Sequence, residues 1–208
     1  MHAFEILIAS AAACIVLHVL AMAAWGRFLG LQIMEIGHGF GPTWGRIGVL
    51  RLGVLPLGGY VRFITPPEDA LGTAAQLLLA LAGTLTLVVV AIALLGLPAF
   101  AAVADGFWQW LRGATSPFGA AQSLLRHARD QTLDGTLVAT FGLVAAKVAA
   151  VNLLPWPVTN GWAALAVVGR RVGLARHWPD ALTKLLASAG LFAFVSWLVA
   201  LGVFVKFG

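Results

Sequence analysis

Four long runs that carry almost no charge constrain this chain more than any other feature of its 208 residues. An apolar run of about 20 residues is long enough for a helix to cross the hydrocarbon core of a bilayer. Charged residues make up only 10% of the chain, against roughly 25% in soluble domains. The sequence therefore predicts an all-α polytopic membrane protein with a single domain, residues 1–208. Its transmembrane helices are expected at residues 6–25, 77–99, 136–156 and 185–205, with Lys147 as their one charged residue.

Basic residues outside these runs predict how the helices are oriented. Residues 26–69 carry four arginines and residues 157–181 carry three, whereas the segment before the first run has only the acidic Glu5. Because positively charged loops tend to stay in the cytoplasm, we expect both loops to be cytoplasmic and both termini to lie outside. A cleaved signal peptide is the other interpretation of the first run, but such peptides begin with a basic segment.

The net charge of +5 does not indicate a nucleic-acid partner, because the chain has no cluster of basic residues interleaved with aromatic ones. The lipid bilayer is the partner that the composition predicts. The single cysteine, Cys14, excludes an internal disulfide.

The glycine-rich connection at residues 44–63 is predicted to form a membrane-associated β-hairpin or looped strand. Short β-type stretches are expected at residues 47–50, 53–55 and 60–63. Pro56 and the pair Gly58-Gly59 are expected to interrupt them. Non-helical backbone at a membrane must be buried in protein or line a wet cavity.

The stretch at residues 107–113, FWQWLRG, places Trp108 and Trp110 beside Arg112. Aromatic and basic side chains gather in this way at the membrane–water interface. An interfacial segment and an ordinary loop with an aromatic anchor both fit this stretch.

Several short motifs resemble, in their order along the chain, those of the site-2 protease family of intramembrane zinc metalloproteases. Residues 18–22 read HVLAM, residues 39–41 GFG, residues 56–61 PLGGYV, and residues 152–157 NLLPWP, followed by Asn160-Gly161. The family has a helix with HExxH, a loop with GFG and PLGGYV, and a later helix with NLLPxPxxDG. Ala82-Gly83 is similar to the family's AGPxxN, although Thr84 and Leu87 replace its Pro and Asn. The resemblance covers the chain from about residue 10 and implies a core of about four transmembrane helices.

The same resemblance implies that the catalytic site is degenerate. A catalytic zinc needs three protein ligands and a water, and hydrolysis needs a base beside that water. His18 matches the first ligand, but Val19 stands at the glutamate position, Met22 at the second ligand and Asn160 at the third. Valine cannot act as a base, and thioether and amide groups are poor zinc ligands. We therefore expect a pseudoprotease with no catalytic residues, no metal and no cofactor.

Other candidate ligands have an ordinary interpretation. Solvated or interfacial side chains are expected for His2, His38, His127 and His177, with His38 in a glycine-rich loop. Cys14, His18 and Met22 share one helix face, a soft set that could hold Cu(I). Packing of small and sulfur-bearing residues in a helix bundle explains the same stripe.

Lys147 is unusual because a charge inside a transmembrane run is costly without a partner or a wet cavity. One hypothesis is that its ammonium fills space left by the lost metal, held by carbonyls, Asn152 or Asn160. The alternatives are that it snorkels to the interface or meets an acidic residue of a partner.

We therefore expect a non-catalytic membrane subunit, scaffold or regulator that binds a transmembrane or membrane-associated protein in the former substrate groove. Binding is expected to involve Gly58, Gly59, Tyr60, Lys147 and Asn152. The family pairs extended substrates with a sheet edge, which residues 44–63 could retain, whereas residues 100–135 are too few for the PDZ domain of one branch. The alternative is a divergent intramembrane zinc metalloprotease; a transporter has only Lys147 in its favour. Compactness and the resemblance suggest a bacterial inner membrane as the location.

Overall fold

Among the residues that the structure describes, three helices are long and apolar enough to cross a membrane. The structure, a computed structural model, describes residues 3–174 and 180–207 and is mostly helical. The long helices are α1 (Ala3–Phe28), α3 (Thr73–Leu95) and α8 (Asp180–Phe207), which correspond to three of the four predicted runs. Helix α3 ends four residues earlier than predicted, because Gly96 adopts a positive φ of 69° and Pro98 follows. The prediction of an α-rich membrane protein is confirmed for these three helices.

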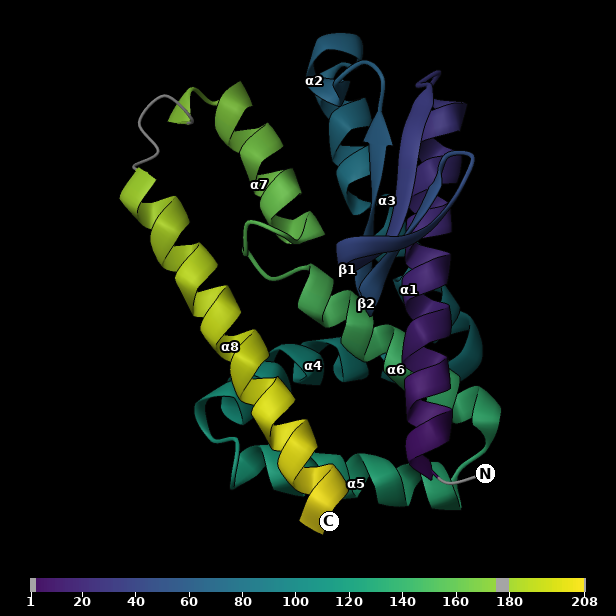
Figure 1. Ribbon diagram of the computed structural model, residues 1–208, viewed down its shortest axis with the longest axis vertical. Helices are drawn as coiled ribbons and strands as arrows, with labels where there is room; N and C mark the ends of the chain where they lie inside the picture. The colour runs from purple at the N-terminus through teal and green to yellow at the C-terminus, as the bar shows by residue number, and fades with distance from the viewer. Residues whose placement is uncertain (1–2, 175–179, 208) are drawn as a thin grey trace.

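The fourth predicted run folds as a shorter helix followed by a break. Helix α6 (Leu137–Asn152) has 16 residues and is about 24 Å long, whereas the hydrocarbon core is about 30 Å thick. The helix ends at Asn152 because Pro155 and Pro157 cannot continue it. Helix α7 (Asn160–Arg171) then resumes in the same general direction (Figure 1). A continuous helix over residues 136–156 is therefore not what forms.

Two amphipathic helices occupy the connection between α3 and α6. These helices, α4 (Pro98–Thr115) and α5 (Ala120–Asp134), lie across the lower part of the molecule in Figure 1. The stretch 107–113, expected to be an interfacial segment or loop, belongs to α4. Trp108 is exposed there, but Trp110 turns toward the interior.

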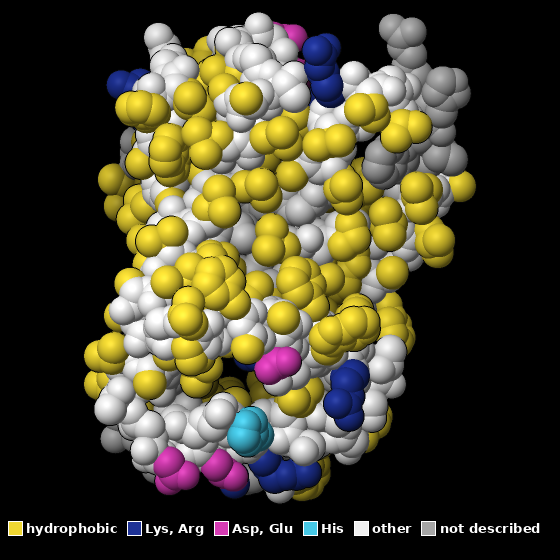
Figure 2. All heavy atoms as spheres, turned by 180° about the vertical axis from the view of Figure 1, so that it is seen from behind, with side chains coloured by type: hydrophobic (Ala, Val, Ile, Leu, Met, Phe, Trp, Pro, Cys, Tyr) yellow, Lys and Arg dark blue, Asp and Glu magenta, His cyan; other side chains and the backbone are white. Residues whose placement is uncertain are grey.

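Apolar and charged side chains are distributed along the long axis of the molecule as in a membrane protein. Both chain ends lie at the lower end in Figure 1, and the short helix α2 (Pro67–Ala70) lies at the upper end. Hydrophobic side chains cover the middle of the rear face, and charged side chains gather mainly toward its two ends (Figure 2).

The sheet consists of two antiparallel strands, β1 (Ile33–Ile47) and β2 (Leu50–Phe63). The turn between them contains Gly48 at a φ of 56°, so the prediction of a strand over residues 47–50 is wrong. Strand β2 also continues through Pro56 and Gly58, where an interruption was expected. His38 lies in β1 rather than in a loop. Ile36 is paired with both Val61 and Leu50, because the hairpin tip folds back beside β1.

The core lies where α6 packs against α1, α3 and α4. Ala145, Ala146 and Ala149 of α6 are fully buried, as are Cys14 of α1 and Ala91 of α3. Small side chains let transmembrane helices approach closely, which gives van der Waals contact in a setting where lipid weakens the hydrophobic drive.

Candidate functional site

A cavity of about 1230 Å³ is lined on opposite sides by residues of α1 and α8. Strand β2 and helix α7 line one end, α5 lines the other, and α4 and α6 contribute to the wall between them. The cavity is bordered by all five predicted binding residues, Gly58, Gly59, Tyr60, Lys147 and Asn152. It also reaches His18, Met22 and Asn160. Two regions of its lining carry the polar groups that matter here, one around His18 and one around Lys147.

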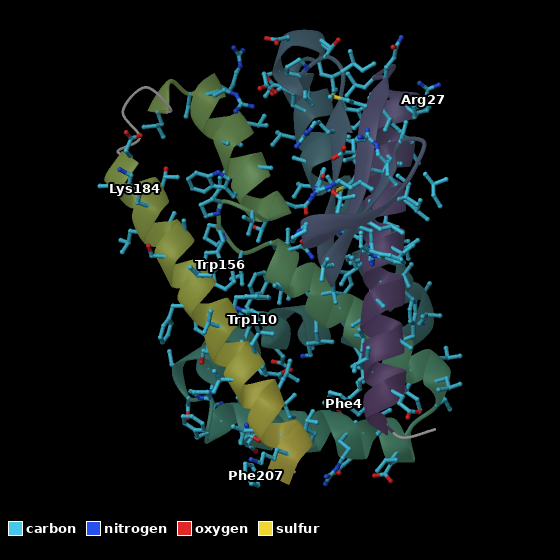
Figure 3. All side chains as sticks on the ribbon, viewed as in Figure 1. Phe4, Arg27, Trp110, Trp156, Lys184 and Phe207 are labelled. Atoms are coloured by element: carbon cyan, nitrogen blue, oxygen red, sulfur yellow. The ribbon has the colours of Figure 1, made fainter. Side chains whose placement is uncertain are left out.

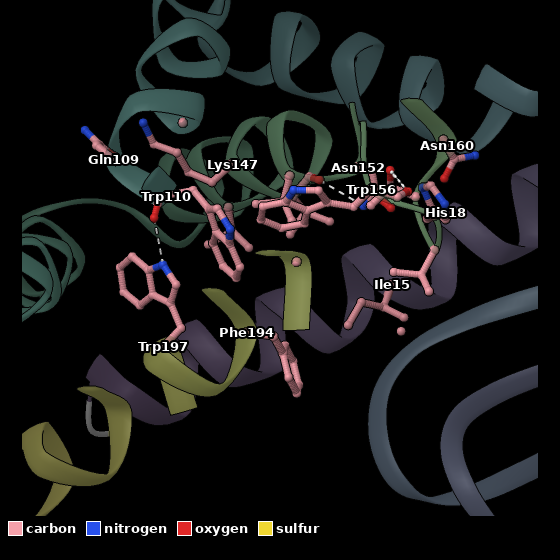
Figure 4. A pocket seen from close by; sticks show the side chains of 18 of the residues that line it. Ile15, His18, Gln109, Trp110, Lys147, Asn152, Trp156, Asn160, Phe194 and Trp197 are labelled. Atoms are coloured by element: carbon pink, nitrogen blue, oxygen red, sulfur yellow. Dashed lines mark hydrogen bonds between the residues drawn. The ribbon is translucent and has the colours of Figure 1, made fainter. Parts of the chain in front are cut away.

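Residues from two helices far apart in the sequence, α1 and α7, meet at the first region. His18 and Met22 lie one turn apart on α1, and Asn160 is the first residue of α7. The Asn160 side-chain amide donates a hydrogen bond to the Ala80 carbonyl and lies 3.9 Å from the Met22 sulfur. Asn160 also lies beside the His18 ring (Figure 4). The residues at the three expected ligand positions are thus neighbours.

Two glycines allow the chain to close around this region. A Cβ at Gly83 of α3 would lie 2.6 Å from the Cε1 and Nδ1 atoms of His18. A Cβ at Gly59 of β2 would lie 2.5 Å from a Val19 methyl and 2.7 Å from the Gly37 carbonyl oxygen. Real Cβ atoms do not approach other atoms so closely. These glycines are therefore required by tight packing against α1.

The break between α6 and α7 fixes the position of Asn160. The Thr159 hydroxyl lies within hydrogen-bonding distance of the Leu154 and Trp156 carbonyls and caps the start of α7. A Cβ at Gly161 would collide with the Leu153 carbonyl. The pair Asn160-Gly161 is held against the NLLP turn in this way.

The chemistry available around His18 is that of packing and hydrogen bonding. Val19 presents methyl groups to Gly59 and offers no base. The Asn160 amide nitrogen is already engaged, and the Met22 thioether is a weak zinc ligand. The Nδ1 atom of His18 is buried without a hydrogen-bond partner among the described residues. Within residues 3–174 and 180–207, no group of three or more His, Cys, Asp or Glu side chains could hold a metal.

The second region lies where α4 crosses α6. The Lys147 ammonium donates a hydrogen bond to the Ala102 carbonyl at 2.9 Å, and its aliphatic stem covers Gly106. In Figure 4 the side chain extends toward Gln109 and away from His18. The hypothesis that this ammonium fills the space of a lost metal is therefore wrong. The ammonium is bound to a carbonyl of α4, and the side chain points away from His18, where the metal ligands were expected.

Asn152 does not hold Lys147 either. Its side-chain nitrogen donates to the Val148 carbonyl of its own helix at 2.9 Å. Asn152 is part of the cavity lining, but its amide hydrogen bond is local.

Three tryptophans join α8 to the rest of the cavity wall. The Trp110 and Trp197 rings stack at 5.4 Å, and Trp110 lies 6.1 Å from Trp156. The Trp197 indole donates to the Trp110 carbonyl at 3.0 Å (Figure 4). Figure 3 shows Trp110 and Trp156 beside α8. Sequence reasoning treated Trp110 as an interfacial anchor and did not assign the other two. Their partners, Gly113 for Trp197 and Gly190 for Trp156, are glycines that a structure alone identifies.

The other candidate metal ligands can be assigned where the structure describes them. Cys14 packs in the core, whereas His18 and Met22 line the cavity, which favours the packing interpretation of that stripe over a copper site. His127 is exposed on α5 at the cavity edge. His2 and His177 lie outside the described residues.

Comparison with known proteins identifies no relative: no family model, no curated protein and no solved structure matches this chain. The likeness to the site-2 protease family remains a prediction. It depends on the motifs themselves and on the meeting of His18, Met22 and Asn160.

Proposed function

We propose that this protein is a non-catalytic membrane subunit, scaffold or regulator, related to site-2 proteases, that holds a transmembrane segment of a partner protein. The observation that carries this proposal is the cavity itself. Its lining is predominantly apolar, and α8, which forms one wall, packs mainly on α4 and α5 at one end. The part of the cavity away from these contacts is left for another occupant.

The dimensions of the cavity suit a helix. A helix about 10 Å in diameter has a cross-section of about 80 Å², so a cavity of this size matches about 15 Å of helix, or three turns. Helix α8 lines the cavity with residues at helical spacing, and one of them, Ala187, is small and exposed. Small residues at such positions permit close helix–helix contact in a membrane.

An extended part of the partner could also be bound beside the helix. Strand β2 lines the cavity at residues 58–61, on the side where it meets α1. Pairing of main-chain groups with a strand edge is a common way to bind extended peptides. We propose that this edge takes the segment adjoining the partner's helix.

A photocrosslinker at a cavity position tests the proposal. Leu191 and Leu185 of α8 are equally exposed, at 64% and 65%, but only Leu191 lines the cavity. With benzoylphenylalanine at each site, we expect an adduct with a defined integral membrane protein from position 191 alone. Ala187→Trp, which places a bulky side chain on the cavity wall, should reduce it. Equal adducts from both sites, or adducts with lipid only, would overturn the proposal.

Metal content tests the non-catalytic part separately. A divergent protease would purify with about one zinc per chain, and His18→Ala would remove it. We expect no such zinc in the wild type. The matched control is His38→Ala, because His38 lies on β1 outside the meeting point of α1 and α7.

The proposed location is a bacterial inner membrane, with residues 26–69 and 157–181 in the cytoplasm. The arginine excess in these segments supports this orientation. Reporter fusions after Arg62 and after Phe207 should report opposite sides of the membrane.

A further inference from the structure

Lys147 brings a positive charge into the cavity at a depth where charges are rare. It is the one charged residue within the four apolar runs and lies ten residues into α6, about 15 Å from the start of that helix. An ammonium group has three donors, and a charge inside a membrane requires a partner or water. Within the described residues, its one hydrogen bond goes to the Ala102 carbonyl.

The described residues place no ion-pair partner within 4.0 Å of this ammonium, although Asp105 also lines the cavity. The ion pairs among the described residues join Arg46 to Glu35 and Arg129 to Asp130. Asp105 of α4 is near enough to act on Lys147 electrostatically, but it is exposed and makes no ion pair with it within 4.0 Å. The other polar side chains on this part of the lining, such as Gln109 and His127, carry no negative charge.

The position of Lys147 selects the kind of anion that can reach it. Lipid headgroups lie at the membrane surface, whereas Lys147 lies well inside an apolar run. Its stem lies flat on Gly106, so the ammonium is held at the α4–α6 crossing rather than extended toward the surface. A side chain of a transmembrane helix can deliver a carboxylate to this depth, and the cavity has the volume of about three turns of such a helix.

We infer that the partner's transmembrane helix carries an aspartate or glutamate that pairs with Lys147. The inference rests on the proposed function and adds the chemistry of the partner to it. The carboxylate completes the hydrogen bonding of the ammonium, and the surrounding apolar lining strengthens the attraction by excluding water.

Designed peptides test this pairing. One probe is a leucine–alanine transmembrane helix of about 24 residues with a single aspartate at its middle, and the matched probe has asparagine there. Each carries a dansyl group, and energy transfer from the tryptophans reports binding to the full chain in phosphatidylcholine vesicles at pH 8. We expect the aspartate peptide to bind about tenfold more tightly than the asparagine peptide. Lys147→Met should remove this difference, whereas Lys184→Met, at an exposed site on α8, should retain it.

The outcomes separate the inference from the function on which it rests. Equal binding of both peptides to the wild type would overturn the carboxylate inference and leave the proposed function standing. Binding of neither peptide would overturn the proposed function. Lys147→Arg keeps the charge and should keep the preference, which distinguishes pairing from loss of folding. A preference that disappears when phosphatidylglycerol is added would assign the anion to lipid and overturn the inference.

Discussion

The two polar regions of one cavity differ in how tightly the chain packs around them. Around His18, Asn160 donates to Ala80 and contacts Met22, and Gly83 lets α3 close on the imidazole. Around Lys147, one carbonyl bonds an ammonium that borders open volume. The first region is closed by packing, although the His18 Nδ1 atom has no hydrogen-bond partner among the described residues, whereas the second presents a charged group to open volume. This difference is a reason to look for function at the second region.

Restoring zinc ligands around His18 is the change with the largest expected effect on the contrast between the two regions. Because His18, Met22 and Asn160 already meet, we expect the double variant Met22→His, Asn160→Asp to bind about one zinc per chain. Elemental analysis after purification measures this directly. Adding His18→Ala to the double variant should remove the metal. A double variant that folds but remains without zinc would show that the three positions do not form a ligand set.

Crowding the His18 region should destabilise the protein. In Gly83→Ala the new methyl group overlaps the His18 ring, so the free energy of unfolding should fall by about 2 kcal/mol. Gly202→Ala in α8 is the matched control, because no atom lies within 4 Å of its added Cβ. Unfolding in detergent followed by circular dichroism compares the two. Equal stability of both variants would contradict the closed packing described for this region.

Removing the charge of Lys147 should stabilise the isolated protein, whereas crowding the His18 region should destabilise it. Lys147→Met keeps the length of the side chain and removes a poorly paired charge, so the isolated protein should gain about 1 kcal/mol. The same unfolding measurement applies. A large loss of stability would mean that Lys147 serves the fold of the isolated chain, and the contrast between the regions would disappear.

Acid should loosen the hairpin beside the His18 region, with a smaller effect. The Tyr60 hydroxyl donates to Glu35, and this bond, with help from Arg62, Arg46 and Arg51, holds the pKa of Glu35 below its usual value. The folded hairpin therefore favours the carboxylate. Its contribution is complete above the usual glutamate pKa of about 4.3 and is lost as the pH falls through the lower folded pKa.

Unfolding midpoints at pH 6 and pH 3 measure this effect. The wild type should lose more stability than Glu35→Gln over the same interval, because the variant has no carboxylate to protonate. Identical pH dependence in the two proteins would contradict the role of Glu35.

Hydrophobicity predicted the elements whose environment is lipid. Helices α1, α3 and α8 are long and apolar, and their positions were read correctly from uncharged runs. Helices α4 and α5 were missed, since both contain charged residues and neither forms an uncharged run of transmembrane length. Gly106 and Gly113 in α4 also resemble loop residues. They are glycines because α6 and Trp197 pack directly on them, a reason that lies in distant parts of the chain.

The candidate site was predictable in its residues but not in its geometry. The resemblance to site-2 protease motifs predicted that His18, Met22 and Asn160 would meet, and all five expected binding residues line one cavity. The direction of the Lys147 side chain depends on where α4 crosses α6, and the sequence contains no local signal for that crossing. For the same reason the tryptophan contacts of α8 were not foreseen.

The short length of α6 has a consequence for how the protein is assembled. A lysine near the centre of a helix costs about 2.5–3.5 kcal/mol on insertion, and α6 has only 16 residues to offset it. This segment is therefore the least able to leave the translocon for lipid alone. Its alanine-rich faces require α1, α3 and α4 as neighbours, and all three precede it in the chain. Because synthesis starts at the N-terminus, α1, α3 and α4 are made before α6 and can form the surface on which it packs.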